Sequence, residues 1–198
     1  MRLNRLGLER GTMWSALAMV VAVFLPAALW GLWDDSVPGE EELPPGAVVE
    51  REALPPPMSL SEPSLVRLTI PDEGWSISTG AGSPTAATLV NSPVTLTVTA
   101  VAGVENMETL YKRQARGLGE KESAMFTTNR RDYTTESGLE GYWANLTGDN
   151  HNGVLVVVGK QDAAAVVVVR APMGRLEGVM GDVVEIVESL EVSAEAVS

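Results

Sequence analysis

The sequence predicts an α/β (α+β) domain that follows a single membrane-spanning helix, and three patterns carry this prediction. Met13–Trp33 is a 21-residue apolar stretch, the length of a transmembrane helix. Residues 64–170 contain short runs in which apolar residues alternate with Thr and other polar residues, separated by Gly, Asn and Asp. Such runs are typical of an antiparallel sheet. Apolar residues at helical spacing over 105–117 and 174–189 predict two helices that sandwich this sheet.

The segment Met13–Trp33 contains no charged residue and only one hydroxyl, that of Ser15. At about 1.5 Å per residue it forms a helix of roughly 31 Å, which matches the hydrocarbon core of a bilayer. Three arginines precede it and acidic residues follow it, so residues 1–12 are expected in the cytoplasm and everything after Trp33 outside. A cleaved signal peptide is the alternative, but its apolar region is shorter and ends before a polar mature start. We therefore expect a retained single-pass anchor in the cell membrane.

The composition is strongly acidic, with 14 basic and 26 acidic residues and a formal net charge of −12. Three arginines and Glu9 precede the anchor, which leaves 11 basic against 25 acidic residues outside and a net charge of about −14 there. Such a surface repels nucleic acid and anionic headgroups, and it suits a basic partner or simply keeps the domain in solution. The absence of Cys excludes disulfides, thiol catalysis and a lipidated cysteine.

A segment rich in proline and acids, Asp34–Pro63, follows the anchor. It holds seven of the 12 prolines and eight acids against one base, Arg51. This composition buries little apolar surface and predicts an extended tether between the membrane and the domain. The domain itself is expected over residues 64–192, and 193–198 as a short tail.

Within the domain, the alternation predicts strands near 65–70, 86–90, 94–101, 124–129, 132–136, 139–147, 154–159 and 163–170. The continuous apolar runs Leu155–Val158 and Val166–Val169 are typical of central strands that are covered on both faces. We expect the helix over 174–189, with its broad apolar stripe, to cover the second face.

Several phrases resemble proteins of the PsbP-like fold: IPDEGW (70–75), TLTV (95–98), SGLEGYWA (137–144), VVVVRAP (166–172) and VESLEV (187–192). The resemblance covers about residues 64–192. It implies an antiparallel sheet between helices and a non-catalytic accessory role, as in extrinsic subunits of photosystem II and actinobacterial envelope lipoproteins. It names no partner, and this chain has a membrane helix where those lipoproteins have a lipidated cysteine.

The sequence offers no catalytic constellation, so we expect no enzyme and no cofactor. It has no Cys, a single histidine, no nucleophile elbow and no phosphate-binding glycine loop. His151 lies in the turn Gly148–Gly153 beside Asp149 and Asn150, residues that can bind a divalent metal. The same residues are common in polar turns because they adopt the required backbone angles, and we assign no metal.

Two sets of residues are candidates for partner binding. Trp75 and Trp143 are aromatic residues that either anchor an interface or pack in the core. Ser15, Ala18 and Ala22 form a stripe of small residues on the predicted membrane helix, where small side chains let another helix approach closely.

These features predict a non-catalytic accessory or assembly subunit of a bacterial membrane complex, with integral membrane proteins as partners. The alternative is an envelope binding protein that holds a lipid, a glycolipid or another small ligand in a groove of the domain. Neither role involves nucleic acid.

Overall fold

A computed structural model describes residues 39–53, 64–78, 83–120, 125–160 and 162–194. The folded unit begins at Glu40. Within these ranges no helix is both long and apolar enough to cross a membrane, and the predicted span Met13–Trp33 lies outside them.

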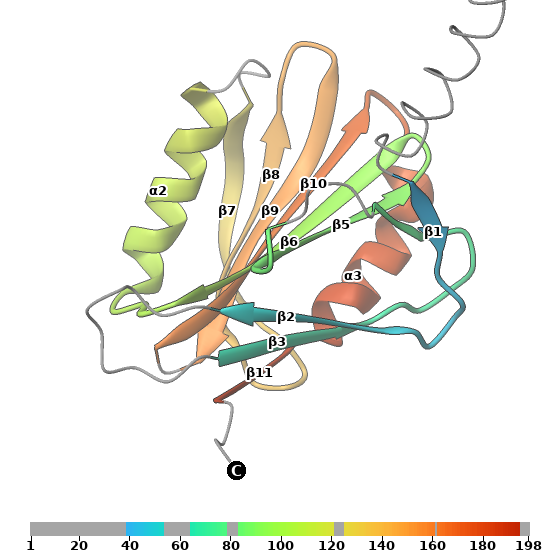
Figure 1. The fold of residues 1–198 in the computed structure, drawn as a ribbon. Coiled ribbons are helices and arrows are strands. Elements are labelled where there is room, and N and C mark those ends of the chain that lie inside the picture. Colours follow the sequence, from blue (N-terminus) through green and yellow to red (C-terminus); the bar gives the residue numbers. More distant parts are fainter. Residues whose placement is uncertain (1–38, 54–63, 79–82, 121–124, 161, 195–198) are drawn as a thin grey trace, which may run out of the picture. The chain divides into compact units, whose positions relative to one another are not determined.

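The main layer is a fully antiparallel sheet of eight strands in the order β1-β4-β5-β6-β10-β9-β8-β7 (Figure 1). The strand bounds are β1 Glu40–Glu42, β4 Ser76–Ser78, β5 Ala86–Asn91, β6 Val94–Ala102, β7 Phe126–Thr134, β8 Glu140–Thr147, β9 His151–Lys160 and β10 Ala163–Pro172. The mostly antiparallel sheet predicted from the alternation is therefore confirmed.

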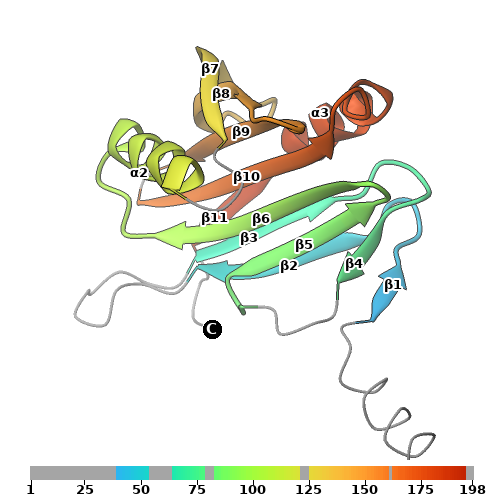
Figure 2. The ribbon, with the colours of Figure 1, turned by 90° about the horizontal axis from the view of Figure 1, so that it is seen from above.

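Three further strands form a second antiparallel sheet in the order β11-β3-β2. This small sheet and α3 share one core with the large sheet. Its strands are β2 Val48–Ala53, β3 Ser64–Thr69 and β11 Glu191–Ala194. The helices are α2 (Met107–Glu120), the short 3-10 turn η1 (Glu177–Val179) and α3 (Met180–Glu188). Figure 2 shows α2 and α3 on opposite sides of the β8–β10 part of the sheet.

The apolar runs predicted as central strands are central strands. Val154, Val156 and Val158 of β9 face a core shared with the small sheet and α3. Leu155 and Val157, between them, face a second core under α2. Because successive side chains of a strand point to opposite faces, a run of five apolar residues fits only a strand covered on both sides.

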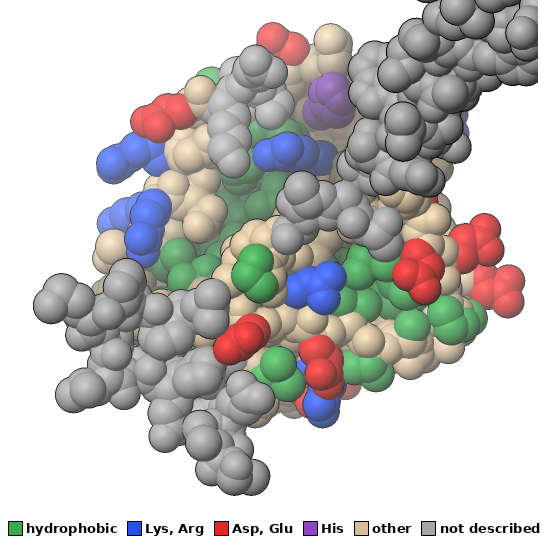
Figure 3. Space-filling view, in the orientation of Figure 1, with side chains coloured by type: hydrophobic (Ala, Val, Ile, Leu, Met, Phe, Trp, Pro, Cys, Tyr) green, Lys and Arg blue, Asp and Glu red, His purple; other side chains and the backbone are tan. Residues whose placement is uncertain are grey.

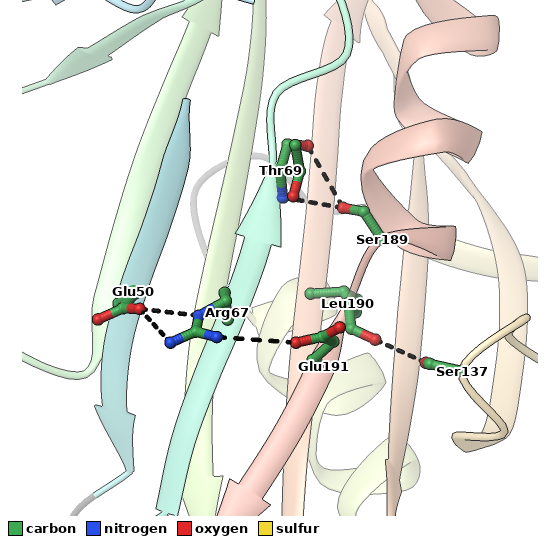
Figure 4. A network of polar contacts seen from close by, with 7 residues as sticks. All are labelled: Glu50, Arg67, Thr69, Ser137, Ser189, Leu190 and Glu191. Atoms are coloured by element: carbon green, nitrogen blue, oxygen red, sulfur yellow. Dashed lines mark hydrogen bonds and ion pairs between the residues drawn. The ribbon is translucent and has the colours of Figure 1, made fainter. Parts of the chain in front are cut away.

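Polar contacts tie the small sheet to α3 (Figure 4). The Ser189 hydroxyl accepts the Thr69 N–H at 2.9 Å, and the Ser137 hydroxyl donates to the Leu190 carbonyl at 2.6 Å. Arg67 of β3 pairs with Glu50 of β2 at 2.6 Å, with both side chains about half exposed. The exposed ion pair adds little stability, whereas the two serine contacts fix the end of α3 against both sheets.

The predicted tether over Asp34–Pro63 is wrong for residues 40–53. Glu40–Glu42 pairs with β4 as the edge strand β1, and Val48–Ala53 pairs with β3 as β2. Val49 and Ala53 of β2 are buried in the core. The proline and acid content concealed both strands, because edge strands bury few side chains and expose the charged ones.

Three smaller predictions also differ from the structure. The strands expected at 124–129 and 132–136 form one strand, β7, with a bulge between Thr128 and Arg131 where Asn129 has a φ of 51°. The last helix is shorter than expected, because η1 precedes α3. Ser193 and Ala194, which were expected in the short tail, belong to β11, which pairs with β3.

Candidate functional site: an acidic cavity beside β1

An open cavity of about 790 Å³ lies where β1 meets the turn between β3 and β4. Its walls combine carboxylates, hydroxyls and apolar side chains, contributed by Glu40, Glu42, Leu43, Pro44, Pro45, Glu73, Gly74, Trp75, Ser76, Val90 and Ser92. These residues come from three separate stretches of the chain, so the cavity exists only because β1, β4 and β5 are neighbours. Figure 3 shows acidic side chains gathered around β1.

Backbone contacts hold the β1 side of the cavity in place. The Leu43 N–H donates to the Trp75 carbonyl at 2.8 Å, and the Gly46 N–H donates to the Ile70 carbonyl at 2.8 Å. Gly46 has a φ of 78°, a left-handed conformation that glycine adopts without strain, so the Pro44-Pro45-Gly46 stretch can turn sharply into β2. The cavity wall is therefore part of the folded unit.

The cavity is electrostatically negative. Glu40 accepts a hydrogen bond from the Ser76 hydroxyl at 3.3 Å. The carboxylates of Glu42 and Glu73 have no hydrogen bond or ion pair with another described residue, and the lining contains no Lys or Arg. Three carboxylates around one opening repel each other and favour a positively charged group between them.

Trp75 lines this cavity and packs in the core, which is one of the two roles that the sequence leaves open for it. Its side chain is 1% exposed and belongs to the core shared with α3. The indole N–H donates to Asp182 Oδ2 at 3.1 Å. A buried indole needs such a partner, and here the bond fixes α3 behind the cavity wall.

Trp143 is likewise buried, at 5% exposure, and so has the core position that the sequence leaves open as one of its two roles. Its ring lies 5.2 Å from that of Tyr133, and the Arg131 guanidinium lies 5.3 Å from its centroid. The neighbouring Tyr142 points to the other face of β8, as the strand period predicts, where Arg130 lies 3.9 Å from its ring. These aromatic residues serve the packing of β7 against β8.

Tyr133 also joins β7 to α3. Its hydroxyl donates to one carboxylate oxygen of Glu188, and the other oxygen accepts the Glu136 N–H at 2.6 Å. Partial burial, and then the bond to the Glu188 carboxylate, raise the pKa of the Tyr133 phenol above its ordinary value. The phenol therefore stays neutral at physiological pH and acts as a structural donor.

Of the remaining candidate residues, His151 is the one that the structure describes. His151 is exposed at the start of β9, opposite Pro172 of β10. In the ranges that the structure covers, no group of three His, Cys, Asp or Glu side chains is arranged to hold a metal. Ser15, Ala18 and Ala22 lie outside the described residues.

Sequence reasoning missed the cavity because two of its three glutamates were assigned to the tether. The signal that could have revealed it is the turn Pro44-Pro45-Gly46 followed by the strand-like run from Val48 to Ala53. A tight turn before a β-prone run is typical of a strand pair.

No family model matches the sequence, and no curated protein matches it. The structure is similar to the solution structure of cyanobacterial PsbP from Synechocystis sp. PCC 6803, with a TM-score of 0.49 and 10% identity over 71% of this chain and 98% of that one. A crystal structure from Bacteroides thetaiotaomicron VPI-5482 has a TM-score of 0.37 and 14% identity over 66% of this chain and 46% of that one. One of these two neighbours is a PsbP protein, the kind of protein that the sequence resembles, and we draw nothing about the fold or the function of this chain from the likeness.

Proposed function

We propose that the chain is a non-catalytic accessory or assembly subunit of a bacterial membrane complex. In this proposal Met13–Trp33 anchors the chain, residues 1–12 are cytoplasmic, and the folded unit from Glu40 lies outside. Integral membrane proteins of the complex are its partners.

The observation that carries this proposal is the position of β1. Because the folded unit begins at Glu40, only residues 34–39 separate it from the end of the predicted membrane helix. At 3.3–3.6 Å per residue, these six residues span at most about 22 Å. A 30-residue tether would have reached about 30 to 90 Å. The short connection keeps the domain at the membrane surface, where it can contact the outer parts of a membrane protein.

The acidic cavity suggests the chemistry of that partner. β1 forms one wall of the cavity and is the first strand after the connection. Its carboxylates repel anionic headgroups and attract Lys or Arg side chains. A basic outer segment of a membrane protein fits this edge better than the lipid surface does. The anchor adds effective concentration, which allows each individual contact to be weak.

The first experiment tests the topology. Protease added outside spheroplasts should digest the folded unit, because this proposal puts it beyond the membrane. Protection of that unit, or a mature chain that begins near Asp34, would contradict a retained anchor with its N-terminus inside.

The second experiment tests whether the helix itself binds the complex. Ala18→Leu combined with Ala22→Leu should keep the chain in the membrane but reduce co-purification of stoichiometric partners in mild detergent, because Leu blocks close helix approach. The matched control is Val20→Leu with Phe24→Leu, which at helical spacing falls on the opposite face. If both double variants co-purify with partners as well as the natural chain does, the helix only anchors the chain and does not bind the complex.

A further inference from the structure

Among the residues that the structure describes, α2 covers only part of one face of the large sheet. Helix α2 packs on β7, β8 and β9, and its core reaches Ala164 and Val166 of β10, whereas the same face of β5 and β6 and the Arg170 end of β10 are only partly buried. Thr95, Thr97 and Thr99 of β6 stand half-buried on this face. Thr88 of β5 lies opposite Thr97, with their hydroxyl oxygens 3.5 Å apart. A row of threonines usually marks a solvated face, so a binding role needs a feature that solvent alone does not explain.

That feature is Arg170, which lies on the same face of β10. It stands between Thr95 of β6 and Gly153 of β9 and is half-buried. Its Nε is buried and has no hydrogen-bond partner. No carboxylate among the described residues pairs with its guanidinium, although the chain holds 26 acids. A guanidinium stays charged in a protein, and a half-buried charge without a counterion is unfavourable.

The other half-buried arginine in the described ranges shows the usual solution. The Nε of Arg51 donates to the Ala86 carbonyl at 2.9 Å, and one terminal nitrogen donates to the Glu50 carbonyl at 2.7 Å. Arg170 has neither kind of contact. Among the described residues its charge therefore has no partner, and this favours a ligand that brings an anionic oxygen.

The strand beside Arg170 carries no side chain at the neighbouring position, Gly153. A Cβ on Gly153 would lie 2.0 Å from the Val169 carbonyl oxygen, so this position accepts no side chain. No side chain of β9 therefore stands next to the guanidinium in this row of the sheet. The Gly153 backbone lies close against β10 at this point.

An apolar floor leads away from the guanidinium. Val168 lies on the same face of β10, two residues before Arg170, and is half-buried between Thr97 and Leu155. Val166, two residues before Val168, is 2% exposed. Burial increases along this row because the floor continues into the core under α2. Figure 3 shows apolar side chains in a hollow between α2 and the β5–β6 strands, with a basic side chain at its upper end.

We propose that this face binds a single acyl lipid, whose anionic headgroup pairs with Arg170 and whose chain lies along Val168 toward α2. One cation matches one carboxylate or phosphate, and the apolar floor matches a hydrocarbon chain. The acidic surface elsewhere disfavours binding to an anionic bilayer as a whole, so the ligand is a lipid molecule taken up individually. The site is separate from the acidic cavity and does not depend on it.

The test uses the full chain in a mild non-ionic detergent and a photoactivatable long-chain fatty acid as the probe. Label should map by mass spectrometry to β10 and α2. Excess oleate should compete with the probe, whereas oleyl alcohol, which lacks the charge, and inorganic phosphate, which lacks the chain, should not. Competition by phosphate as strong as that by oleate would indicate a free oxyanion site and overturn the lipid assignment.

Variants then test the residues. Arg170→Gln should lower labelling about tenfold or more, since a charge-assisted bond is lost. The matched control is Arg175→Gln, an exposed arginine beyond the end of β10, which should label like the natural chain. If Arg170→Gln fails to fold, Thr97→Leu, which fills the hollow and leaves the guanidinium in place, should lower labelling instead. Full labelling of a folded Arg170→Gln or Thr97→Leu chain, or label that maps elsewhere, would overturn the proposal.

Discussion

The bond between Tyr133 and Glu188 connects the edge strand β7 to the last residue of α3, and its removal has a predictable cost. In Tyr133→Phe, Glu188 keeps the Glu136 N–H as its remaining partner and loses the phenol. A hydrogen bond to a charged group contributes about 1.5–3 kcal/mol. Because both side chains are half-buried, water replaces part of that bond, and we expect a loss of about 1–2 kcal/mol. For a domain of this size, that lowers Tm by roughly 2–8 °C.

The assay is thermal unfolding of the full chain in mild detergent at pH 7, followed by near-ultraviolet circular dichroism. Tyr111→Phe is the matched control, because it removes the same atom from a ring that packs on Tyr142 but whose hydroxyl bonds no described residue. The control should change the free energy of unfolding by less than about 0.5 kcal/mol. A Tyr133→Phe chain as stable as this control would refute the reasoning.

The pH dependence provides a second check with a definite sign. The pKa of Tyr133 is raised in the folded chain, whereas the phenol of the unfolded chain ionises near pH 10. The stabilisation by the phenol is therefore complete below about pH 10 and is lost as the pH rises above it. The difference in unfolding free energy between the natural chain and Tyr133→Phe should shrink above pH 10. A difference that grows between pH 9 and 11 would contradict the assigned bond.

Three further predictions concern the domain boundary, the sheet and α2. A fragment of residues 64–198 should lack a cooperative near-ultraviolet transition that a fragment from Glu40 onward shows, because residues 40–53 supply two strands and part of the core. Gly141→Ala should lower the free energy of unfolding by about 1–3 kcal/mol or more, since its Cβ would lie 1.9 Å from a carbonyl oxygen of β9. In α2, the Cβ of Gly117→Ala meets nothing within 4 Å, so this variant should raise the free energy of unfolding by about 0.5–1 kcal/mol. The hydrogen bond from Lys112 lowers the pKa of Glu108, so the natural chain should exceed Glu108→Gln in stability at pH 6, and this difference should vanish as the pH falls through that lowered pKa.

The central strands were predictable because their signal is local. A run such as Val166–Val169 is apolar on both faces, and only a doubly covered strand accommodates that. β1 and β2 were not predictable in this way, because they lie at sheet edges and expose their charges. Val49 and Ala53 are the fully buried residues of β2, too few to outweigh the surrounding prolines and acids.

The sites were less predictable than the fold because they depend on pairing between distant segments. The acidic cavity requires Glu42 opposite Ser76, and Ser76 opposite Val90. Arg170 has no recognisable motif, and its lack of a partner follows only from the register that sets it beside Thr95. The positions of the two tryptophans could not be predicted either, because an aromatic residue in a sequence can belong to an interface or to the core.

The most direct test of the proposed function is site-specific photo-crosslinking from the cavity rim in intact membranes. A photoreactive residue at Glu73 should crosslink to an integral membrane protein, whereas one at Lys160, which is exposed but does not line the cavity, should not. In a chain that also carries Glu40→Gln and Glu42→Gln, the crosslink from position 73 should weaken, because the attraction for basic side chains is reduced. Equal crosslinking from both positions, or none from the rim, would contradict docking of a membrane partner at this edge.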